Sequence, residues 1–379
     1  MNTYDVAILG SGTMGSATAL ELRRRKVSCI AFDQFTPPHG RGSHSGQTRI
    51  FRLAHYDTPK YVPLAQRAGR LWDELSSELG APLLTRIGLL KMGPAGDTLI
   101  DGIRQCAAEW NLPVDTLSAS EVRYRYPAFQ IPDAFTGVLE TTAGWIDVDS
   151  AILGLQSKAR ELGAELCLNE AVLEWKAEGD GVAVRTAARR IHANRLVITA
   201  GAWATHILGD LGLPVRVLRK TFFWLDPLDP EKFTVDAIPI FGFPPGVFYG
   251  FPNIRGEGVK VAEHLGGEPL EAGSLPEPAP DHKPILETAA RFMPGLAGPP
   301  PGNSSRIVKT ASCLYAMTCD EHFIIDVHPR FPNVVYAAGF SGHGFKFTPV
   351  IGEVMADLVI EGRTQLPVDF LRASRFISE

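Results

Sequence analysis

Two cysteines six positions apart, Cys313 and Cys319, lie in the segment TASCLYAMTCDEHFIID at residues 310–326. With His322 nearby, these side chains suggest a metal site, a disulfide or a thiol with another use. The spacing does not match a zinc site and no second close pair of ligands follows, so we expect no metal. The five cysteines are few, odd in number and scattered, which argues against a disulfide framework. A single thiol, either buried or reactive, is the interpretation that remains.

A second group of residues that could form a binding site is the glycine-rich run from Gly10 to Gly15, GSGTMG. A short apolar run precedes it, a helical pattern follows, and a second strand pattern ends at Asp33. In this context Gly10 permits a tight turn, Gly12 lets backbone N–H groups approach a pyrophosphate, and Gly15 allows close helix–strand packing. The helix N-terminus carries partial positive charge, and Asp33 can accept hydrogen bonds from a ribose diol. The pattern predicts a dinucleotide site.

A second glycine turn opens another helix at the far end of the chain, in NVVYAAGFSGHGFKFTPVIGEVMADLV at residues 333–359. The helix start near Phe345 to Pro349 offers donors to an electron-rich group. The edge of a flavin ring becomes negative on reduction, and a helix N-terminus stabilises such charge. NAD has no such requirement, so the two turns together favour FAD, bound between the two chain ends.

The elements that position these turns indicate an α/β fold, with a Rossmann-like FAD-binding domain and a second, mixed-sheet substrate domain. Helical spacing covers residues 61–79, 97–110 and 147–162, and Ser118 with Glu121 forms a candidate capping box. Short strands fill residues 165–199 and lead to a turn at Gly201. We assign 1–80, 145–215 and 310–379 to a discontinuous FAD-binding domain, and 81–144 and 216–309 to the substrate domain.

The bulk composition excludes several classes of function. The chain has 379 residues, enough for about two domains, and a net charge of −5 that gives no reason to expect nucleic acid or an anionic membrane as partner. It contains no apolar run long enough for a transmembrane helix and no signal-peptide pattern at its N-terminus. We expect a cytoplasmic protein, and the sequence leaves the oligomeric state open.

Several segments together resemble the monomeric sarcosine oxidase and N-methyltryptophan oxidase family. They are GSGTMGS, GSHSGQTRIFR, YVPLAQRAGRLWDEL, FYGFPN, DEHFIIDVHP and AAGFSGHGFKF, in family order over nearly the whole chain. The resemblance implies an FAD-dependent oxidase that converts a secondary amino acid, N-methyl or cyclic, into an imine and hydrogen peroxide. It leaves open a flavin dehydrogenase with a quinone or protein acceptor, and an oxidase of primary or sugar-modified amino acids. A binding protein that uses the nucleotide structurally is a rival from another class.

The resemblance also gives a role to the cysteine segment. Cys313 matches the family cysteine that is joined through sulfur to the 8α-methyl carbon of the flavin. Strand alternation places Cys313, Tyr315 and Met317 on one face, and Cys319 as well if the strand stays regular. Without the resemblance, we would interpret Cys313 as a small, buried hydrophobic residue of the core. We interpret Cys319 as an incidental thiol.

The family pattern further implies a set of basic and aromatic site residues. Arg52 and Lys346 match the pair that holds the substrate carboxylate, and Lys260 matches the lysine that assists oxygen reduction by stabilising superoxide. The remaining catalytic candidates are Arg49, Tyr249, His264 and Tyr315. The predicted cofactor contacts are Gly10, Gly12, Thr13, Met14, Gly15, Asp33, Gln34, Ser43, His44, Thr48, Arg49, Val172, Gly201, Cys313, Gly342, Gly344, Phe345 and Lys346.

Each basic candidate has an ordinary structural alternative. Arg52 could form a surface salt bridge, Lys346 could be a solvated loop residue and Lys260 an exposed strand residue, while Tyr249 could simply pack in a strand. Two positions depart from the family pattern: Ser45 stands where the family has a flavin-proximal histidine, and Gln47 where it has an acid. The aromatic run of residues 222–224 suits a bulky substrate or the core, and we favour the core.

Overall fold

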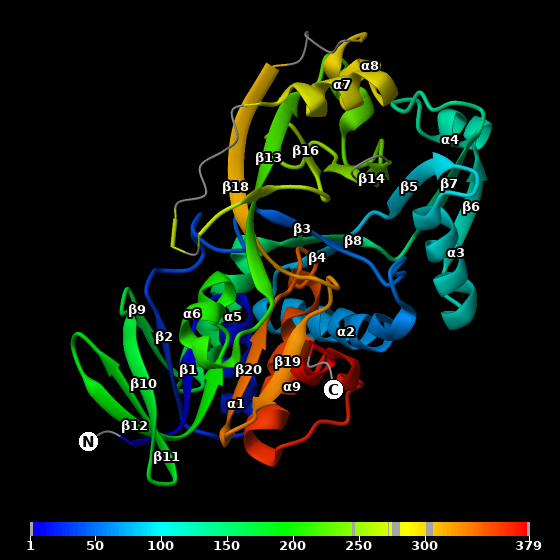
Figure 1. Cartoon of the computed structure of the whole chain (residues 1–379). Helices are drawn as coiled ribbons and strands as arrows, with labels where there is room; N and C mark the ends of the chain where they lie inside the picture. The colour runs from blue at the N-terminus through cyan, green and yellow to red at the C-terminus, as the bar shows by residue number, and fades with distance from the viewer. Residues whose placement is uncertain (1–2, 245–246, 272, 275–280, 301–305, 377–379) are drawn as a thin grey trace.

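The structure is a computed structural model that describes residues 3–244, 247–271, 273–274, 281–300 and 306–376. Its first sheet has the order β10-β11-β12-β1-β2-β9, with β20 beside β12 and β19 beside β20 (Figure 1). Strands β1, β2, β9, β12 and β20 pair in parallel. The bounds are β1 (Thr3–Leu9), β2 (Cys29–Asp33), β9 (Glu165–Leu168), β10 (Val172–Glu178), β11 (Gly181–Thr186), β12 (Arg190–Ile198), β19 (Ile324–His328) and β20 (Phe331–Ala338).

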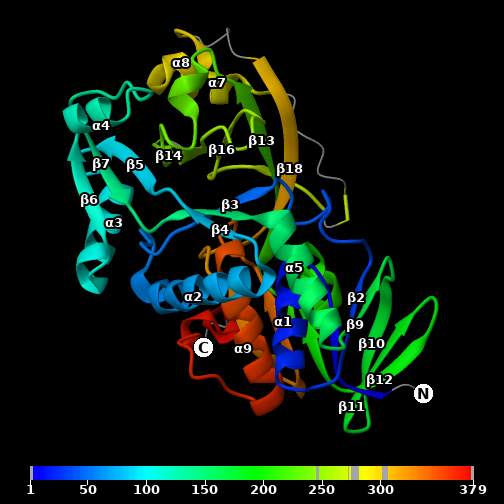
Figure 2. The same ribbon diagram turned by 180° about the vertical axis from the view of Figure 1, so that it is seen from behind.

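Three helices pack beside this sheet in one layer: α1 (Thr13–Arg24), α5 (Val148–Glu161) and α9 (Thr348–Glu361) (Figure 2). Helices α1 and α9 come from opposite ends of the chain, and they approach closely because Gly352 has no side chain. A Cβ added at Gly352 would lie 2.7 Å from the carbonyl carbon of Ala17. This contact brings the two predicted glycine turns to the same edge of the sheet.

The second sheet has the order β17-β13-β16-β15-β14-β5-β7-β6, and β18 pairs with β13. Strands β13 and β18 are long and extend from this sheet toward the first one (Figures 1 and 2). The bounds are β5 (Leu89–Pro94), β6 (Val114–Ser118), β7 (Phe135–Glu140), β13 (Val215–Asp226), β14 (Ile240–Phe243), β15 (Phe248–Phe251), β16 (Val259–Glu263), β17 (Glu268–Pro269) and β18 (Arg306–Thr318).

A small third sheet lies between the two larger ones and contains β3 (Thr48–Phe51), β8 (Gly144–Asp147) and β4 (Leu84–Arg86) (Figure 1). The other α-helices are α2 (Val62–Leu79), α3 (Thr98–Trp110), α4 (Ala119–Arg125), α6 (Ala204–Ile207), α7 (Lys283–Phe292) and α8 (Pro294–Ala297). Short 3-10 helices are η1 (Pro59–Tyr61), η2 (Gly201–Trp203), η3 (Gly209–Leu211), η4 (Pro230–Phe233), η5 (Phe345–Phe347), η6 (Asp369–Leu371) and η7 (Ala373–Phe376).

The three predicted helices form within a residue or so of their predicted ends, as α2, α3 and α5. Their caps explain the starts: the Asp97 carboxylate accepts from the backbone N–H groups of Leu99 and Ile100, and Asp147 accepts from Ser150. The capping box of Ser118 and Glu121 is also present, at the start of α4. The helix starts depend on capping residues that lie within three positions in the chain, which is why the sequence alone predicts them.

The predicted domain boundary at residue 310 falls inside a strand. Arg306–Thr318 is one continuous strand, β18, and it pairs along β13 in the second sheet. A boundary at residue 310 therefore cuts this strand, and the chain returns to the first sheet at β19. Among the described residues, no helix is long and apolar enough to cross a membrane.

Candidate functional site

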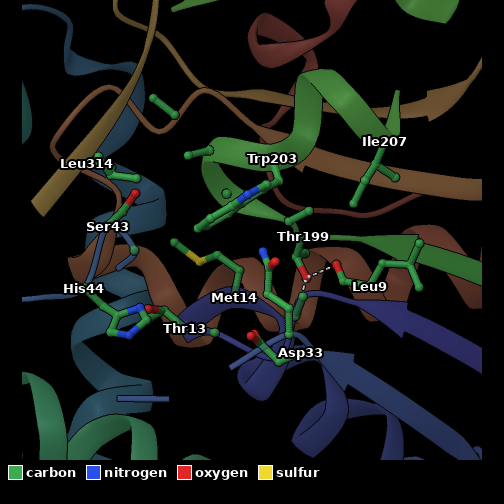
Figure 3. A pocket seen from close by; sticks show the side chains of 18 of the residues that line it. Leu9, Thr13, Met14, Asp33, Ser43, His44, Thr199, Trp203, Ile207 and Leu314 are labelled. Atoms are coloured by element: carbon green, nitrogen blue, oxygen red, sulfur yellow. Dashed lines mark hydrogen bonds between the residues drawn. The ribbon is translucent and has the colours of Figure 1, made fainter. Parts of the chain in front are cut away.

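A cavity of about 530 Å³ lies where the first β–α turn meets the C-terminal glycine turn. Its walls come from the start of α1, the end of β2, the loop after β2, the start of β10, η2, β18 and the segment before α9. Figure 3 shows Thr13, Met14, Asp33 and Trp203 around this space, with Ser43 and His44 at one side. We call it the nucleotide cavity.

The turn between β1 and α1 depends on two glycines. Gly10 has φ +96°, and a Cβ added there would lie 2.5 Å from the backbone oxygen of Thr199. A Cβ on Gly15 would lie 1.8 Å from the backbone oxygen of Gly10. The first turn of α1 has no side-chain cap and no acidic residue, so its N–H groups remain available to an anion in the cavity.

Asp33 lies at the end of β2 and lines the nucleotide cavity, as predicted for a ribose contact. Its two carboxylate oxygens accept hydrogen bonds from the backbone N–H groups of Ser11 and Phe35, each at 3.0 Å. Burial raises the pKa of Asp33 to about 6, because the charged form loses solvation. A hydroxyl donor placed beside this carboxylate would compensate for part of that loss.

The loop after β2 and the strand that follows it, β3, bring two basic side chains to the cavity. His44 is buried, its Nε2 accepts from the backbone N–H of His39 at 3.0 Å, and burial lowers its pKa to about 3. The ring is therefore neutral. The Arg49 guanidinium donates to the backbone oxygens of Ser43, Ser45 and Thr48, which fixes the loop around it. Arg49 also lies over the Phe222 ring, 5.3 Å from its centre.

A second cavity of about 100 Å³ adjoins the first and shares Arg49, Tyr315, Gly342 and Phe345 with it. We call it the cationic cavity, because four basic side chains line it: Arg49, Arg52, Lys91 and Lys346. The only carboxylate among its lining residues, as far as the structure describes them, is that of Glu140.

The predicted substrate ligands Arg52 and Lys346 both line the cationic cavity. Arg52 donates to the backbone oxygen of Ala54, lies 4.0 Å from the Asp57 carboxylate and covers the Tyr56 ring. Lys346 Nζ donates to the backbone oxygen of His343 at 2.7 Å. Burial lowers the pKa of Lys346 well below its usual value, and Arg52 lowers it further. Lys346 is buried, which excludes the solvated-loop alternative, whereas Arg52 combines an ion pair with Asp57 with a place in the cavity wall.

The aromatic candidates line the same cavity. Tyr249, His264 and Tyr315 are all present in its wall, and the Tyr315 hydroxyl lies 3.4 Å from His264 Nδ1. The Tyr315 ring packs directly against Gly342, where a Cβ would lie 2.2 Å from it. Burial lowers the pKa of His264 to about 3, and the charges of Lys220, Lys91, Arg52 and Lys346 act in the same direction.

Lys260 and Cys313 lie outside both cavities as their walls are described. Lys260 Nζ donates to the backbone oxygens of Gly46 and Thr48 and to the Thr48 hydroxyl, and it lines a separate cavity of about 30 Å³. It is buried, which excludes the exposed-strand alternative. Cys313 is fully buried in β18, and burial raises the pKa of its thiol. Its neighbour Leu314 lines the nucleotide cavity.

Fourteen of the predicted cofactor residues line the nucleotide cavity, while Thr48 and Lys346 line the cationic cavity. Gly15 packs against the backbone of Gly10 and does not line either cavity. Cys313 packs among residues of β13 and β18. The fourteen are Gly10, Gly12, Thr13, Met14, Asp33, Gln34, Ser43, His44, Arg49, Val172, Gly201, Gly342, Gly344 and Phe345.

The cysteines form no metal site or disulfide in the part of the chain that the structure describes. Strand β18 ends at Thr318, so Cys319 does not continue the buried face of Cys313 and is exposed. Phe222, Phe223 and Trp224 are buried, as expected for core residues.

Sequence reasoning missed Lys91 and Glu140, which both line the cationic cavity. Lys91 interrupts the apolar run LLKM of β5, and Glu140 ends β7. A charged residue inside an otherwise apolar strand is a signal that could have identified Lys91, because such residues are rarely buried without a reason.

Residues 5–358 match the family described as DAO, FAD dependent oxidoreductase. Monomeric sarcosine oxidase of Bacillus sp. (strain B-0618) is 34% identical, over 98% of this chain and 96% of its own. N-methyl-L-tryptophan oxidase of Salmonella dublin is also 34% identical, over 98% of this chain and 99% of its own.

Among solved structures, a Tyr-to-Phe mutant of NikD in its open form, described as an unusual amino acid oxidase essential for nikkomycin biosynthesis, superposes with a TM-score of 0.84. It is 25% identical to this chain and covers 98% of it, with 97% of its own length aligned. This likeness confirms the predicted α/β fold. The chain belongs to the DAO family of FAD-dependent oxidoreductases, within the group of monomeric sarcosine oxidase and N-methyl-L-tryptophan oxidase.

Proposed function

We propose that this chain is an oxidase of secondary amino acids, N-methyl or cyclic, that yields an imine and hydrogen peroxide. One observation carries the proposal: the nucleotide cavity opens beside a small cationic cavity, and the two share Arg49, Tyr315, Gly342 and Phe345. This arrangement suits a cofactor ring on one side and a small carboxylic acid on the other. The names of the relatives support the same substrate class.

The residues of the nucleotide cavity fit FAD. The turn at Gly10 and Gly15 leaves no space for a Cβ, and α1 begins without a side-chain cap, which suits a pyrophosphate against its first turn. Asp33 would hold the ribose diol. The 3-10 helix η5 and the start of α9 would direct N–H donors to the flavin ring.

Arg52 and Lys346 would hold the substrate carboxylate in the cationic cavity. A guanidinium and an ammonium in a buried site bind a carboxylate through charge-assisted hydrogen bonds, each contributing about 1.5–3 kcal/mol. The hydrogen bonds of Arg52 to Ala54 and of Lys346 to His343 hold both groups in place before the substrate arrives. Binding therefore requires little ordering of these side chains.

The cavity also favours a substrate amine without a proton. The guanidinium groups of Arg49 and Arg52 belong to residues of the wall, and His264 stays neutral because burial and the neighbouring charges lower its pKa to about 3. An added ammonium would be repelled, whereas a neutral amine would not. No side-chain base is then needed to free the nitrogen lone pair.

FAD held by Gly10, Gly12 and Asp33 would supply a two-electron acceptor for the hydride equivalent on the carbon next to nitrogen, and dioxygen would take these two electrons with two protons to form hydrogen peroxide. The imine product hydrolyses in water. We further propose that Lys260 assists oxygen reduction and that Cys313 joins the flavin through sulfur. Support for the tether is that Leu314 and Tyr315, on the same strand, line the nucleotide cavity. A cytoplasmic location remains a prediction from the sequence.

An anaerobic screen of the purified yellow protein tests the function. We expect secondary amino acids to bleach the flavin absorbance without air, and one equivalent of peroxide to appear when air is admitted. Replacing Arg52 by Met should raise KM about 10- to 100-fold, from the loss of one charge-assisted contact. Arg86→Met is the matched control, since Arg86 pairs with Asp73 on the surface.

The outcomes separate the rival functions. Bleaching without peroxide, together with reduction of an added quinone, would indicate a dehydrogenase. Bleaching by primary or sugar-modified amino acids alone would indicate a different substrate class. A spectrum that no amino acid changes would mean that the nucleotide has a structural use.

A further inference from the structure

Lys91 is a buried amine that the proposed reaction does not use. It lies in the middle of β5 and is paired with Gly242 of β14 and Val138 of β7. Strand β5 lies between β14 and β7 in the second sheet (Figures 1 and 2). Strand alternation places Lys91 on the face of Leu89, and both line the cationic cavity. Its side chain is 7% exposed. A Cβ at Gly242, its neighbour on β14, would lie 2.4 Å from Lys91 Nζ, so the glycine makes room for the amine.

Lys91 differs from the other buried lysines in having no partner. Lys220 Nζ donates to the backbone oxygens of Leu265 and Gly266. Lys260 has three oxygen acceptors, and Lys346 has the backbone oxygen of His343. Within the described parts of the chain, no hydrogen bond or ion pair reaches Lys91 Nζ. A buried ammonium without a partner is strongly disfavoured in a folded protein, so a missing partner points to a ligand.

The single carboxylate in the cavity wall does not serve Lys91. The two oxygens of Glu140 accept from the backbone N–H groups of Leu53 at 2.6 Å and Ala54 at 3.1 Å. Glu140 thus holds the segment that follows Arg52. The cavity therefore has a lysine amine on the second-sheet side in addition to the pair proposed for the substrate carboxylate.

We propose that Lys91 binds a second carboxylate of the substrate, so that the preferred substrates are secondary amino acids carrying two acid groups. The second group lies on the side chain or on the nitrogen substituent, as in N-methylaspartate, N-methylglutamate or iminodiacetate. This inference rests on the proposed function and narrows its substrate class.

The composition of the cavity wall agrees with this assignment. Four basic side chains line the cavity, and Glu140 is the one carboxylate among its described lining residues. Burial, aided by Arg52, lowers the pKa of Lys91 to about 7. A carboxylate beside Nζ would favour the ammonium form and complete the contact.

The test compares acids with their uncharged isosteres on the flavin-loaded enzyme. We expect kcat/KM for N-methylglutamate to exceed that for N-methylglutamine by about 10- to 100-fold, as for one charge-assisted contact. Lys91→Met should remove this ratio, and Lys91→Arg should keep most of it. Lys220→Met is the matched control: it also removes a buried lysine, but one whose amine is held by backbone oxygens outside the cavity wall. It should keep the ratio.

A binding measurement provides a second readout that does not need turnover. Succinate should perturb the flavin spectrum at a lower concentration than propionate, and Lys91→Met should abolish the difference. The inference is overturned if acid and amide react equally well, or if Lys91→Met slows both by the same factor. If no secondary amino acid of any charge bleaches the flavin, the proposed function itself fails. Bleaching by sarcosine, but not by any diacid, defeats only the role of Lys91.

Discussion

Replacing Gly15 by alanine should damage the fold itself, not only cofactor binding. The new Cβ would lie 1.8 Å from the backbone oxygen of Gly10, about 1.5 Å closer than ordinary contact. That oxygen is held by the Thr199 hydroxyl at 2.8 Å, so it cannot withdraw freely. Overpacking of a rigid site costs about 1–3 kcal/mol and sometimes more, and we expect at least 3 kcal/mol here.

Gly12→Ala is the matched comparison. Its Cβ would meet only His44 Nδ1, at 3.9 Å, so the free energy of unfolding should change by less than about 0.5 kcal/mol. Gly12 nevertheless lines the nucleotide cavity, and the added methyl would keep the pyrophosphate from the backbone. We expect its FAD dissociation constant to rise at least about tenfold, the equivalent of 1.4 kcal/mol.

The assay measures urea unfolding of the apoproteins by tryptophan fluorescence, and FAD affinity by titration, in a Cys313→Ser background that keeps the cofactor exchangeable. Gly15→Ala should unfold at much lower urea than the parent, and Gly12→Ala at nearly the same urea. The reasoning is refuted if Gly15→Ala is as stable as the parent, or if Gly12→Ala is the less stable of the two.

Three further predictions concern single side chains. Lys260→Met should slow flavin reoxidation by oxygen far more than flavin reduction in stopped-flow; equal slowing of both would show that the lysine mainly holds the loop at Gly46 and Thr48. Cys313→Ala should release all flavin on acid precipitation; a parent protein that already releases it has no tether. FAD affinity should fall as the pH drops below about 6, where Asp33, whose pKa burial raises, takes up a proton. Asp33→Asn should bind FAD more weakly with a flat pH profile, and an unchanged slope would argue against a ribose contact.

The sequence predicts the parts of the site that depend on local geometry. The turn at Gly10 and Gly15 and the caps at Asp97, Asp147 and Ser118 follow from residues close in the chain. The convergence of the two glycine turns was also foreseen, because each opens a helix beside a strand. Arg52 and Lys346 came only from the resemblance, since no spacing rule joins residues so far apart.

Other features could not be read from the chain because they depend on packing between distant strands. The charged residue within the apolar run of β5 marks Lys91 in the sequence, but its place in the cavity does not follow from that run. It depends on the pairing of β5 with β14, where Gly242 gives the side chain space, and this pairing has no signal in the sequence. The predicted boundary at residue 310 falls inside β18 for a similar reason: this strand pairs with β13 along its length, and only that partner shows that the strand is continuous.

The packing of the C-terminal helix α9 against the N-terminal helices α1 and α2 has a consequence for biosynthesis. Helix α9 packs on α1 and α2, where Arg67 pairs with Glu353 and the Trp72 indole donates to the backbone oxygen of Lys346. While a ribosome is still making the chain, the turn between β1 and α1 already exists. The residues after β20 that line the nucleotide cavity have not yet been made. A nascent chain thus has half a binding site, and flavin capture must wait until translation has passed α9.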